Sequence, residues 1–169
     1  MLQRWPCAAR GVVCFRYVAY KELMKWIDIP PVWTVLFLVI AWWIARLQPD
    51  WLRLELHFLH IALLGAGLAL MIAAVLEMRR RRTTVIPHME ASHLVTTGVF
   101  GMSRNPIYLA DTFFVAGFAL LWGAPVALIL VPIFMRIITQ RFILPEEAGL
   151  QAKFPEEFAR YAETTRRWI

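Results

Sequence analysis

Long apolar stretches alternate with polar segments along the chain. The first apolar stretch runs from Ile29 to Ala45, with Pro30 and Pro31 at its front, and the second runs without a charge from Leu56 to Leu76. The third extends from Thr112 to Met135 and is also uncharged. About 20 consecutive apolar residues are enough for an α-helix to cross the hydrocarbon core of a bilayer. The pattern therefore predicts membrane-spanning helices, the first of which begins at the two prolines.

The third stretch is interrupted in its middle by Trp122-Gly123-Ala124-Pro125, and a Gly close to a Pro commonly marks a turn. Two interpretations follow. A single span would put Asn105 and Glu146 on opposite sides of the membrane. A hairpin of two helices, at about 106–122 and 125–142, would return both residues to the same side.

The distribution of positive charge favours the hairpin. The chain has 18 Lys and Arg residues, and the hairpin topology puts all of them on the cytoplasmic side except Arg46 and Arg53. Cytoplasmic loops carry such an excess of positive charge in most membrane proteins. The run Arg79–Arg82 marks the cytoplasmic end of the second span. We therefore expect an all-α integral membrane protein of about four transmembrane helices, including a C-terminal helical hairpin.

Composition supports this fold class and excludes a soluble domain. Of the residues, 60% are hydrophobic and 18% are charged, and the mean hydropathy is +0.56. The net charge of +6 follows from the topology, so we expect no nucleic-acid partner. Cys7 and Cys14 lack metal-ligand spacing, and no metal site is expected. Residues 1–25 form a basic arm that is either peripheral or outside the fold, and residues 26–169 are expected to form a single membrane domain.

Two polar motifs lie next to the hairpin, and each has a structural explanation when taken alone. In Arg104-Asn105-Pro106-Ile107-Tyr108, Asn is a good helix cap, Pro suits the first turn and Tyr suits the membrane interface. Pro145-Glu146-Glu147 begins an amphipathic helix, where acidic residues complement the helix dipole. The polar segment 87–100 would then be a cytoplasmic connector.

The order of these motifs nevertheless resembles the isoprenylcysteine carboxyl methyltransferase superfamily, which includes phospholipid N-methyltransferases. The resemblance covers about residues 79–169, the motif-bearing region. It rests on Thr83-Thr84, Pro87-His88, Leu94–Phe100, Arg104–Leu109, Pro145-Glu146-Glu147, Leu150, Phe154, Tyr161 and Arg167–Ile169. The chain departs from the pattern in having Phe100 for Tyr, Asn105 for His, Ala110 for Gly and Pro155 for a Phe-Gly pair.

The resemblance implies that S-adenosylmethionine is the methyl donor and that it binds in segments facing the cytoplasm. Glu146 or Glu147 would pair with its ammonium group, and the start of the helix at Asn105 would receive its carboxylate. The adenine would lie on Phe100. The full set of expected cofactor-binding residues is Ser92, His93, Leu94, Val95, Gly98, Phe100, Asn105, Pro106, Ile107, Tyr108, Glu146 and Glu147.

The resemblance also implies a lipophilic small-molecule or lipid-modified acceptor, and membrane lipids are expected as further partners. The reaction would be most like isoprenylcysteine carboxyl O-methylation, with Arg141 and Glu146 as catalytic residues and Arg141 near the acceptor carboxylate. Methylation of a phospholipid amine or a small thiol is the alternative within enzymes. A non-catalytic membrane protein that retains the fold is the alternative of another class.

Other residues have expected structural roles. Gly65 and Gly67 allow close helix contact in the second span. His57 and His60 share a helix face and are interpreted as interfacial residues. Asp111 lies inside the hairpin and needs a partner, for which Arg104 is the candidate.

Overall fold

The computed structural model describes residues 29–81 and 94–169. The basic arm at 1–25 and the expected cofactor-binding residues Ser92 and His93 therefore lie outside the described residues. Every regular element in these two ranges is helical, as the sequence predicts.

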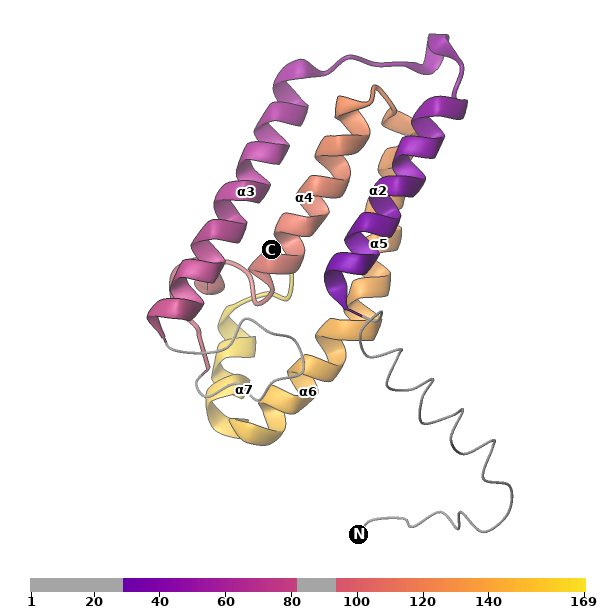
Figure 1. Cartoon of the computed structure of the whole chain (residues 1–169). Coiled ribbons are helices and arrows are strands. Elements are labelled where there is room, and N and C mark those ends of the chain that lie inside the picture. Colours follow the sequence, from indigo (N-terminus) through magenta and orange to yellow (C-terminus); the bar gives the residue numbers. More distant parts are fainter. Residues whose placement is uncertain (1–28, 82–93) are drawn as a thin grey trace, which may run out of the picture.

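The helices form an elongated bundle with a smaller helical region at one end (Figure 1). Its elements in chain order are α2 (Pro30–Leu47), α3 (His57–Arg80), α4 (Pro106–Leu121), α5 (Leu130–Ile138), α6 (Leu144–Lys153) and α7 (Pro155–Thr164). Short 3-10 turns lie at Asp50–Leu52 (η1), Gly98–Gly101 (η2) and Pro125–Ile129 (η3), and a π-helical turn lies at Thr139–Ile143 (η4). Because no break separates η3, α5, η4 and α6, they form one continuous helix, Pro125–Lys153.

Three helices in the described ranges are long and apolar enough to cross a membrane: Pro30–Leu47, His57–Arg80 and Pro125–Lys153. A fourth, α4, is apolar but shorter, with 16 residues. Large apolar side chains cover the outside of the bundle, among them Phe58, which is 93% exposed, and Ile61, which is 62% exposed. Since an apolar surface of this extent suits lipid rather than water, the chain is an integral membrane protein.

The hairpin interpretation of the third apolar stretch is confirmed. Gly123 adopts a φ of +67°, a conformation that glycine reaches without steric cost, between the end of α4 and η3. The Gln48 side chain donates a hydrogen bond to the Gly123 carbonyl (2.6 Å) and ties the turn to the end of α2. Both ends of the hairpin therefore return to the end of the bundle that carries α6 and α7 (Figure 1).

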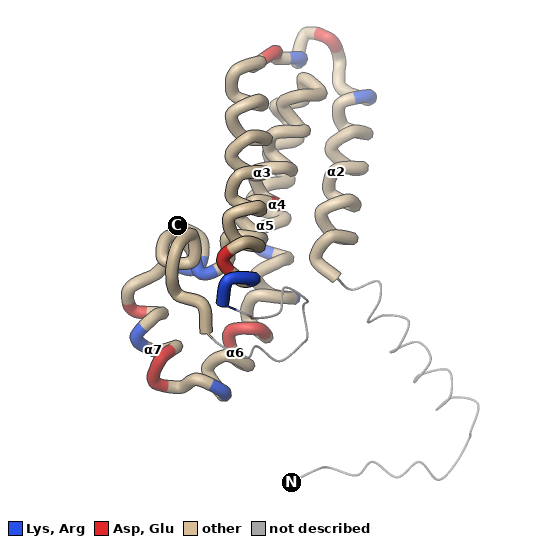
Figure 2. The backbone as a smooth tube through the Cα atoms, turned by 60° about the vertical axis from the view of Figure 1, so that its left-hand side comes forward, with Lys and Arg blue, Asp and Glu red and all other residues tan. Residues whose placement is uncertain are grey.

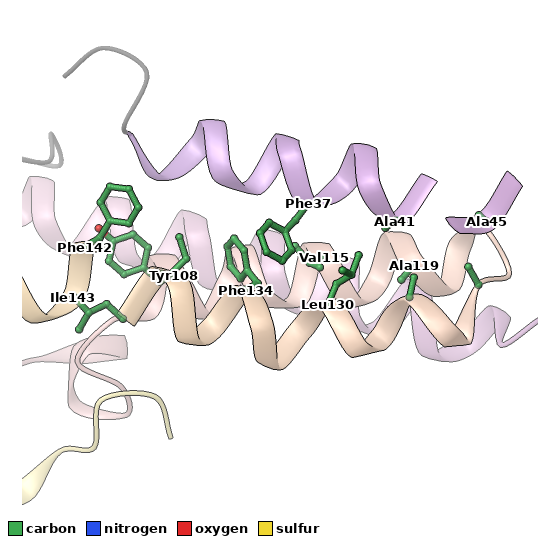
Figure 3. Close-up of a cluster of buried hydrophobic side chains, with 13 residues drawn as sticks. Phe37, Ala41, Ala45, Tyr108, Val115, Ala119, Leu130, Phe134, Phe142 and Ile143 are labelled. Carbon is green, nitrogen blue, oxygen red and sulfur yellow. The ribbon is translucent and has the colours of Figure 1, made fainter. Parts of the chain in front are cut away.

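Charged residues gather at the two ends of the bundle, and few lie between them, among them the buried Asp111 of α4 (Figure 2). The core between these ends packs α2 against α4 and α5 (Figure 3). The rings of Phe37 and Phe134 meet edge to face at 5.2 Å between centroids. Ala41 and Ala119 are completely buried, and such small side chains let helix backbones approach closely.

Helix α3 contacts α4 through small residues. A Cβ atom on Gly67 would lie 3.0 Å from the Phe114 ring and 3.2 Å from the Ala110 carbonyl oxygen, which confirms close packing at Gly67. The expectation for Gly65 was wrong, because nothing lies within 4 Å of its Cβ position and it faces outward. The second close contact comes instead from Gly117 of α4, where a Cβ would lie 2.8 Å from the Leu64 side chain.

Candidate active site

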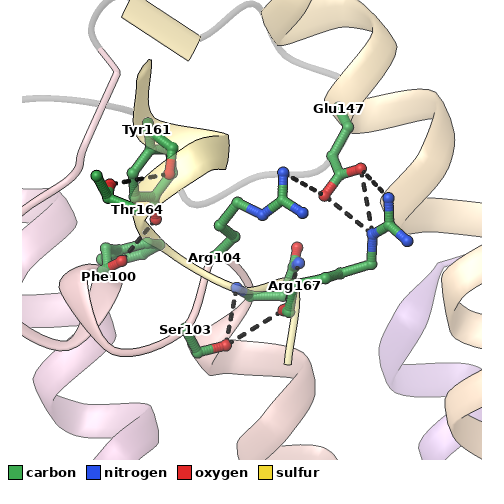
Figure 4. Close-up of polar contacts among 8 residues, drawn as sticks. Phe100, Ser103, Arg104, Glu147, Tyr161, Thr164 and Arg167 are labelled. Carbon is green, nitrogen blue, oxygen red and sulfur yellow. Dashed lines mark hydrogen bonds and ion pairs between the residues drawn. The ribbon is translucent and has the colours of Figure 1, made fainter. Parts of the chain in front are cut away.

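The candidate active site lies at the end of the bundle where η2, the start of α4, the start of α6 and the C-terminal residues meet (Figure 4). The segment after α7 runs back across the start of α4. Along this path the Arg104 backbone N–H donates to the Arg166 carbonyl (3.0 Å), and the Ser103 hydroxyl donates to the Arg167 carbonyl (3.3 Å). The C-terminal residues are therefore part of the site.

Asn105 precedes α4 as expected, but its side chain does not cap the helix. Its Nδ2 atom instead donates to the Arg167 carbonyl at 3.0 Å, across 62 residues of sequence. The expectation of a capping role was wrong, because no amide of the first turn of α4 donates to the Asn105 side chain. Pro106 begins α4 as predicted.

Tyr161 and Thr165 hold the C-terminal region against η2. The Tyr161 hydroxyl donates to the Phe100 carbonyl at 2.6 Å, and the Thr165 hydroxyl donates to the Gly101 carbonyl at 3.5 Å. Burial raises the pKa of the Tyr161 phenol above its ordinary value, so the hydroxyl remains a neutral donor across the physiological range. These bonds fix the backbone of Phe100, whose ring is half-buried.

A carboxylate shared by two arginines lies at the centre of the site. Arg167 donates to both oxygens of Glu147, at 2.6 Å from its terminal nitrogen and 3.1 Å from Nε, and Arg104 lies 3.5 Å from Oε1. The side chains of Glu147 and Arg104 are only 13% and 14% exposed. Hydrogen bonding to Glu147 raises the pKa of Arg167, which stays charged.

This geometry overturns the expected pair between Arg104 and Asp111. Arg104 turns toward Glu147, which lies on a different helix, while Asp111 is buried inside the bundle. The spacing between Arg104 and Asp111 would put them on one face of a single helix. Arg104, however, precedes the first turn of α4, so the two residues do not belong to the same helix.

The acidic pair in Pro145-Glu146-Glu147 is not explained by a helix start. Ile143 and Glu146 lie within the continuous helix Pro125–Lys153, and Ile143 has helical dihedral angles (φ −65°, ψ −48°). No free N-terminal amides exist at this point for the carboxylates to complement. Glu146 instead accepts a hydrogen bond from the Tyr108 hydroxyl at 2.8 Å, which brings two expected site residues together across 38 residues of sequence.

Arg141 lies in the π-helical turn that precedes this acidic pair. Its guanidinium carbon is 5.0 Å from the centre of the Trp33 ring, in the first turns of α2. Single π-turns inserted in α-helices are frequent at functional sites because they reorient side chains. Arg141 is thus an exposed cation on the bundle surface next to the start of α2.

The loop before η2 is anchored to the end of α3. The Thr97 hydroxyl donates to Glu77, and Arg81 donates to the Thr97 oxygen at 3.0 Å. Gly98 has a φ of +61°, and a Cβ atom there would lie 3.2 Å from the Glu77 carboxyl carbon. The positive φ and the close approach of Glu77 favour glycine at this position, and the contribution of Glu77 was not anticipated.

Three further residues expected to bind the cofactor lie within the described part of the chain. Val95 is buried, and Leu94 and Ile107 are half-buried. Sequence reasoning did not assign site roles to Ser103, Arg104, Tyr161 and Arg167, although the last three occur in the motifs that carry the resemblance.

The fold and the site define a helical integral membrane protein with a polar site where the bundle meets its smaller helical region. The chain matches the model of the phospholipid methyltransferase family over residues 56–157, which is more than half of its length. The chain belongs to this family and is an S-adenosylmethionine-dependent membrane methyltransferase. Comparisons with curated proteins and with solved structures found no match. Because the chain belongs to a family of methyltransferases, the alternative of a non-catalytic membrane protein that retains the fold is set aside.

The site residues fit the charges of S-adenosylmethionine, which carries a carboxylate, an ammonium and a sulfonium. The Nε atom of Arg104 is buried and has no hydrogen-bond partner within residues 29–81 and 94–169. A buried guanidinium nitrogen without a partner is costly, and a ligand carboxylate would satisfy it. The half-buried carboxylate of Glu146 supplies the opposite charge close by.

Proposed function

We propose that the methyl donor binds at the junction of η2, α4, α6 and the C-terminal segment, with Glu146 facing its ammonium. Glu147 already shares its charge with Arg104 and Arg167, so another cation would gain little there. The Tyr108 hydroxyl donates to Glu146 and orients this carboxylate at the site. Glu147 would then hold the C-terminal segment in position rather than bind the donor.

The chemistry at this site is methyl transfer from a sulfonium, which is supplied by S-adenosylmethionine when it is bound. A nucleophile with a free lone pair attacks without acid–base assistance, so the protein acts by alignment and by excluding water. Asn105, Arg104 and Tyr108 would orient the donor, and the packed C-terminal residues would close the site to water.

The acceptor in this proposal is a membrane lipid whose anionic group is held by Arg141. The observation that carries it is the position of the Arg141 guanidinium against Trp33, on the bundle surface and one turn before Glu146. A lipid can reach this position from the bilayer. Arginine suits the task because its planar group binds two oxygens of a carboxylate or a phosphate at once.

Two acceptors meet this requirement. The description of the family favours a phospholipid amine, with Arg141 on the phosphate. A nearby cation also favours the neutral, reactive form of the amine. The motifs described above favour a prenylcysteine, with Arg141 on the carboxylate that is methylated. Incubation of the purified protein with labelled S-adenosylmethionine and both lipids decides between them, and we expect the phospholipid to be methylated.

Arg141→Lys is expected to reduce kcat/KM for the preferred lipid about ten- to a hundredfold, because lysine retains the charge but loses the second hydrogen bond. The affinity for S-adenosylhomocysteine should be unchanged. Arg136→Lys is the matched control, since Arg136 is an exposed arginine of the preceding helix α5. Full turnover by Arg141→Lys would remove Arg141 from the acceptor site, and weaker binding of S-adenosylhomocysteine would assign it to the donor.

The active site is proposed to face the cytoplasm, with the Gly123 turn on the other side of the membrane. Apart from Arg46 and Arg53, the arginines of the described residues lie toward the end that carries α6 and α7 (Figure 2). A Gly123→Cys variant without Cys7 and Cys14 should react with an impermeant thiol reagent added outside intact cells. A Gly149→Cys variant, with an exposed position on α6, should react only after lysis. The reverse pattern would invert the topology.

A further inference from the structure

A cavity of about 460 Å³ lies at the end of the bundle opposite Glu146 and Glu147. This distal cavity opens where α2 ends, α3 begins and the chain turns after α4. The end in question also carries the charged connection between α2 and α3 (Figure 2). Its volume falls within the ~300–1,000 Å³ range of small-molecule sites.

The lining of the distal cavity is mainly cationic and aromatic. Arg46 and Arg53 line it, and Glu55 is the acidic side chain in the lining. Arg53 pairs with the outward-facing Asp50 at 2.9 Å. The Arg46 guanidinium lies 5.0 Å from the centre of the Trp42 ring, and no acidic side chain of the described residues pairs with it. The charge of Arg46 is therefore available to an anion.

His60 gives a second, independent indication of a ligand. Its side chain lines the cavity and is only 9% exposed, yet its Nδ1 atom lacks a hydrogen-bond partner in the described part of the chain. The His57 ring lies 5.7 Å away and also lines the cavity. Buried polar atoms in proteins are normally paired, and neutral histidine can donate from Nδ1. The His60 ring therefore forms part of the cavity wall and carries a nitrogen that the described residues leave without a partner.

The aromatic residues indicate the depth of the cavity in the membrane. Trp42 and Trp122 line it, and Trp51 is 79% exposed on the connection that crosses this end. Tryptophan is enriched at the level of lipid headgroups, where an amphipathic ring is stable. The cavity is therefore open to molecules at the headgroup level.

We propose that the distal cavity binds the phosphate of an anionic membrane lipid, with Arg46, Arg53 and His60 around the phosphate oxygens. A soluble phosphate ester has the same chemistry, but the interfacial tryptophans favour the lipid. The proposal does not depend on methyl transfer, because residues at the end of α2 and the start of α3 line the cavity, whereas the candidate active site lies beside α6 and α7. These elements lie at opposite ends of the bundle (Figure 1). It gives the protein a second lipid site.

The test measures thermal stabilisation of the full chain in detergent as a function of added short-chain phosphatidylglycerol. We expect saturable stabilisation, with weaker effects from short-chain phosphatidylcholine and from glycerol 3-phosphate. Arg46→Gln should weaken the apparent affinity about tenfold or more, the effect of one lost charged hydrogen bond. Arg46 is exposed, so this variant should fold. Arg79→Gln, at the other end of the bundle, should leave the affinity unchanged.

Several results would overturn the proposal. They are the absence of saturable stabilisation, equal affinity in the wild type and Arg46→Gln, or an equal loss in Arg79→Gln. Glycerol 3-phosphate binding as tightly as the lipid would overturn the lipid as its source and indicate a site for free phosphate esters. His60→Phe keeps a ring in place and removes both nitrogens, and it should reproduce the effect of Arg46→Gln.

Discussion

Glu146→Gln should weaken the binding of S-adenosylhomocysteine about ten- to a hundredfold while the protein stays folded. Glutamine has nearly the same shape and still accepts the Tyr108 hydrogen bond, but it has no charge for the ligand ammonium. The loss of a hydrogen bond to a charged group costs about 1.5–3 kcal/mol, and each 1.4 kcal/mol corresponds to a factor of ten in affinity. Isothermal titration calorimetry in detergent measures the affinity for S-adenosylhomocysteine directly.

Two further variants make this result specific. Glu157→Gln removes an exposed carboxylate of α7 and should bind the ligand with the affinity of the wild type. Tyr108→Phe removes the hydroxyl that orients Glu146 without changing its charge, and its effect should be smaller than that of Glu146→Gln. Unchanged affinity in Glu146→Gln would exclude Glu146 from the donor site.

Glu147→Gln is expected to lower the stability of the protein, because it leaves Arg104 and Arg167 facing each other without the carboxylate between them. The Arg167 side chain is 35% exposed, so the pair is not fully buried. We therefore expect the free energy of unfolding to fall by about 1.5–3 kcal/mol, the value of one hydrogen bond to a charged group. For a chain of this size the loss corresponds to a decrease in Tm of about 3–12 °C. Thermal unfolding in detergent, followed by circular dichroism, measures the change.

A double mutant separates the ion pair from a general effect of substitution. Arg167→Gln combined with Glu147→Gln should be more stable than the sum of the two single losses predicts, because the second change removes one unpaired cation. Glu163→Gln, which removes an exposed carboxylate of α7, should leave Tm unchanged. Additive losses in the double mutant would show that Glu147 and Arg167 are not coupled.

The membrane architecture could be predicted because it depends on local properties of the sequence. The length of each apolar stretch, the Gly123 turn and the placement of the arginines were sufficient for α2, α3 and the hairpin. The packing of α3 on α4 could not be predicted equally well. A stripe of small residues shows that close contact is possible, but only the rotation of α3 decides that Gly67 faces α4 and Gly65 faces outward.

The sequence predicts candidate site residues, but the contacts among them could not be predicted from it. Tyr108 and Glu146 were both expected in the donor site, and the structure joins them. The bonds from Ser103 and Asn105 to Arg167 span more than 60 residues, and nothing in the local pattern near α4 indicates that the C-terminal segment returns to it. The prediction that Arg104 pairs with Asp111 was wrong for the same reason. Spacing along one helix cannot identify a carboxylate on another.

Ultraviolet cross-linking of the purified protein with methyl-labelled S-adenosylmethionine tests the position of the donor site most directly. The donor is proposed to bind where η2, α4, α6 and the C-terminal segment meet. The labelled peptides are then mapped by mass spectrometry. We expect label within residues 94–108 or 141–168, and we expect excess S-adenosylhomocysteine to abolish it. Label confined to α2 or to the first half of α3, or label that S-adenosylhomocysteine does not displace, would contradict this position of the donor site.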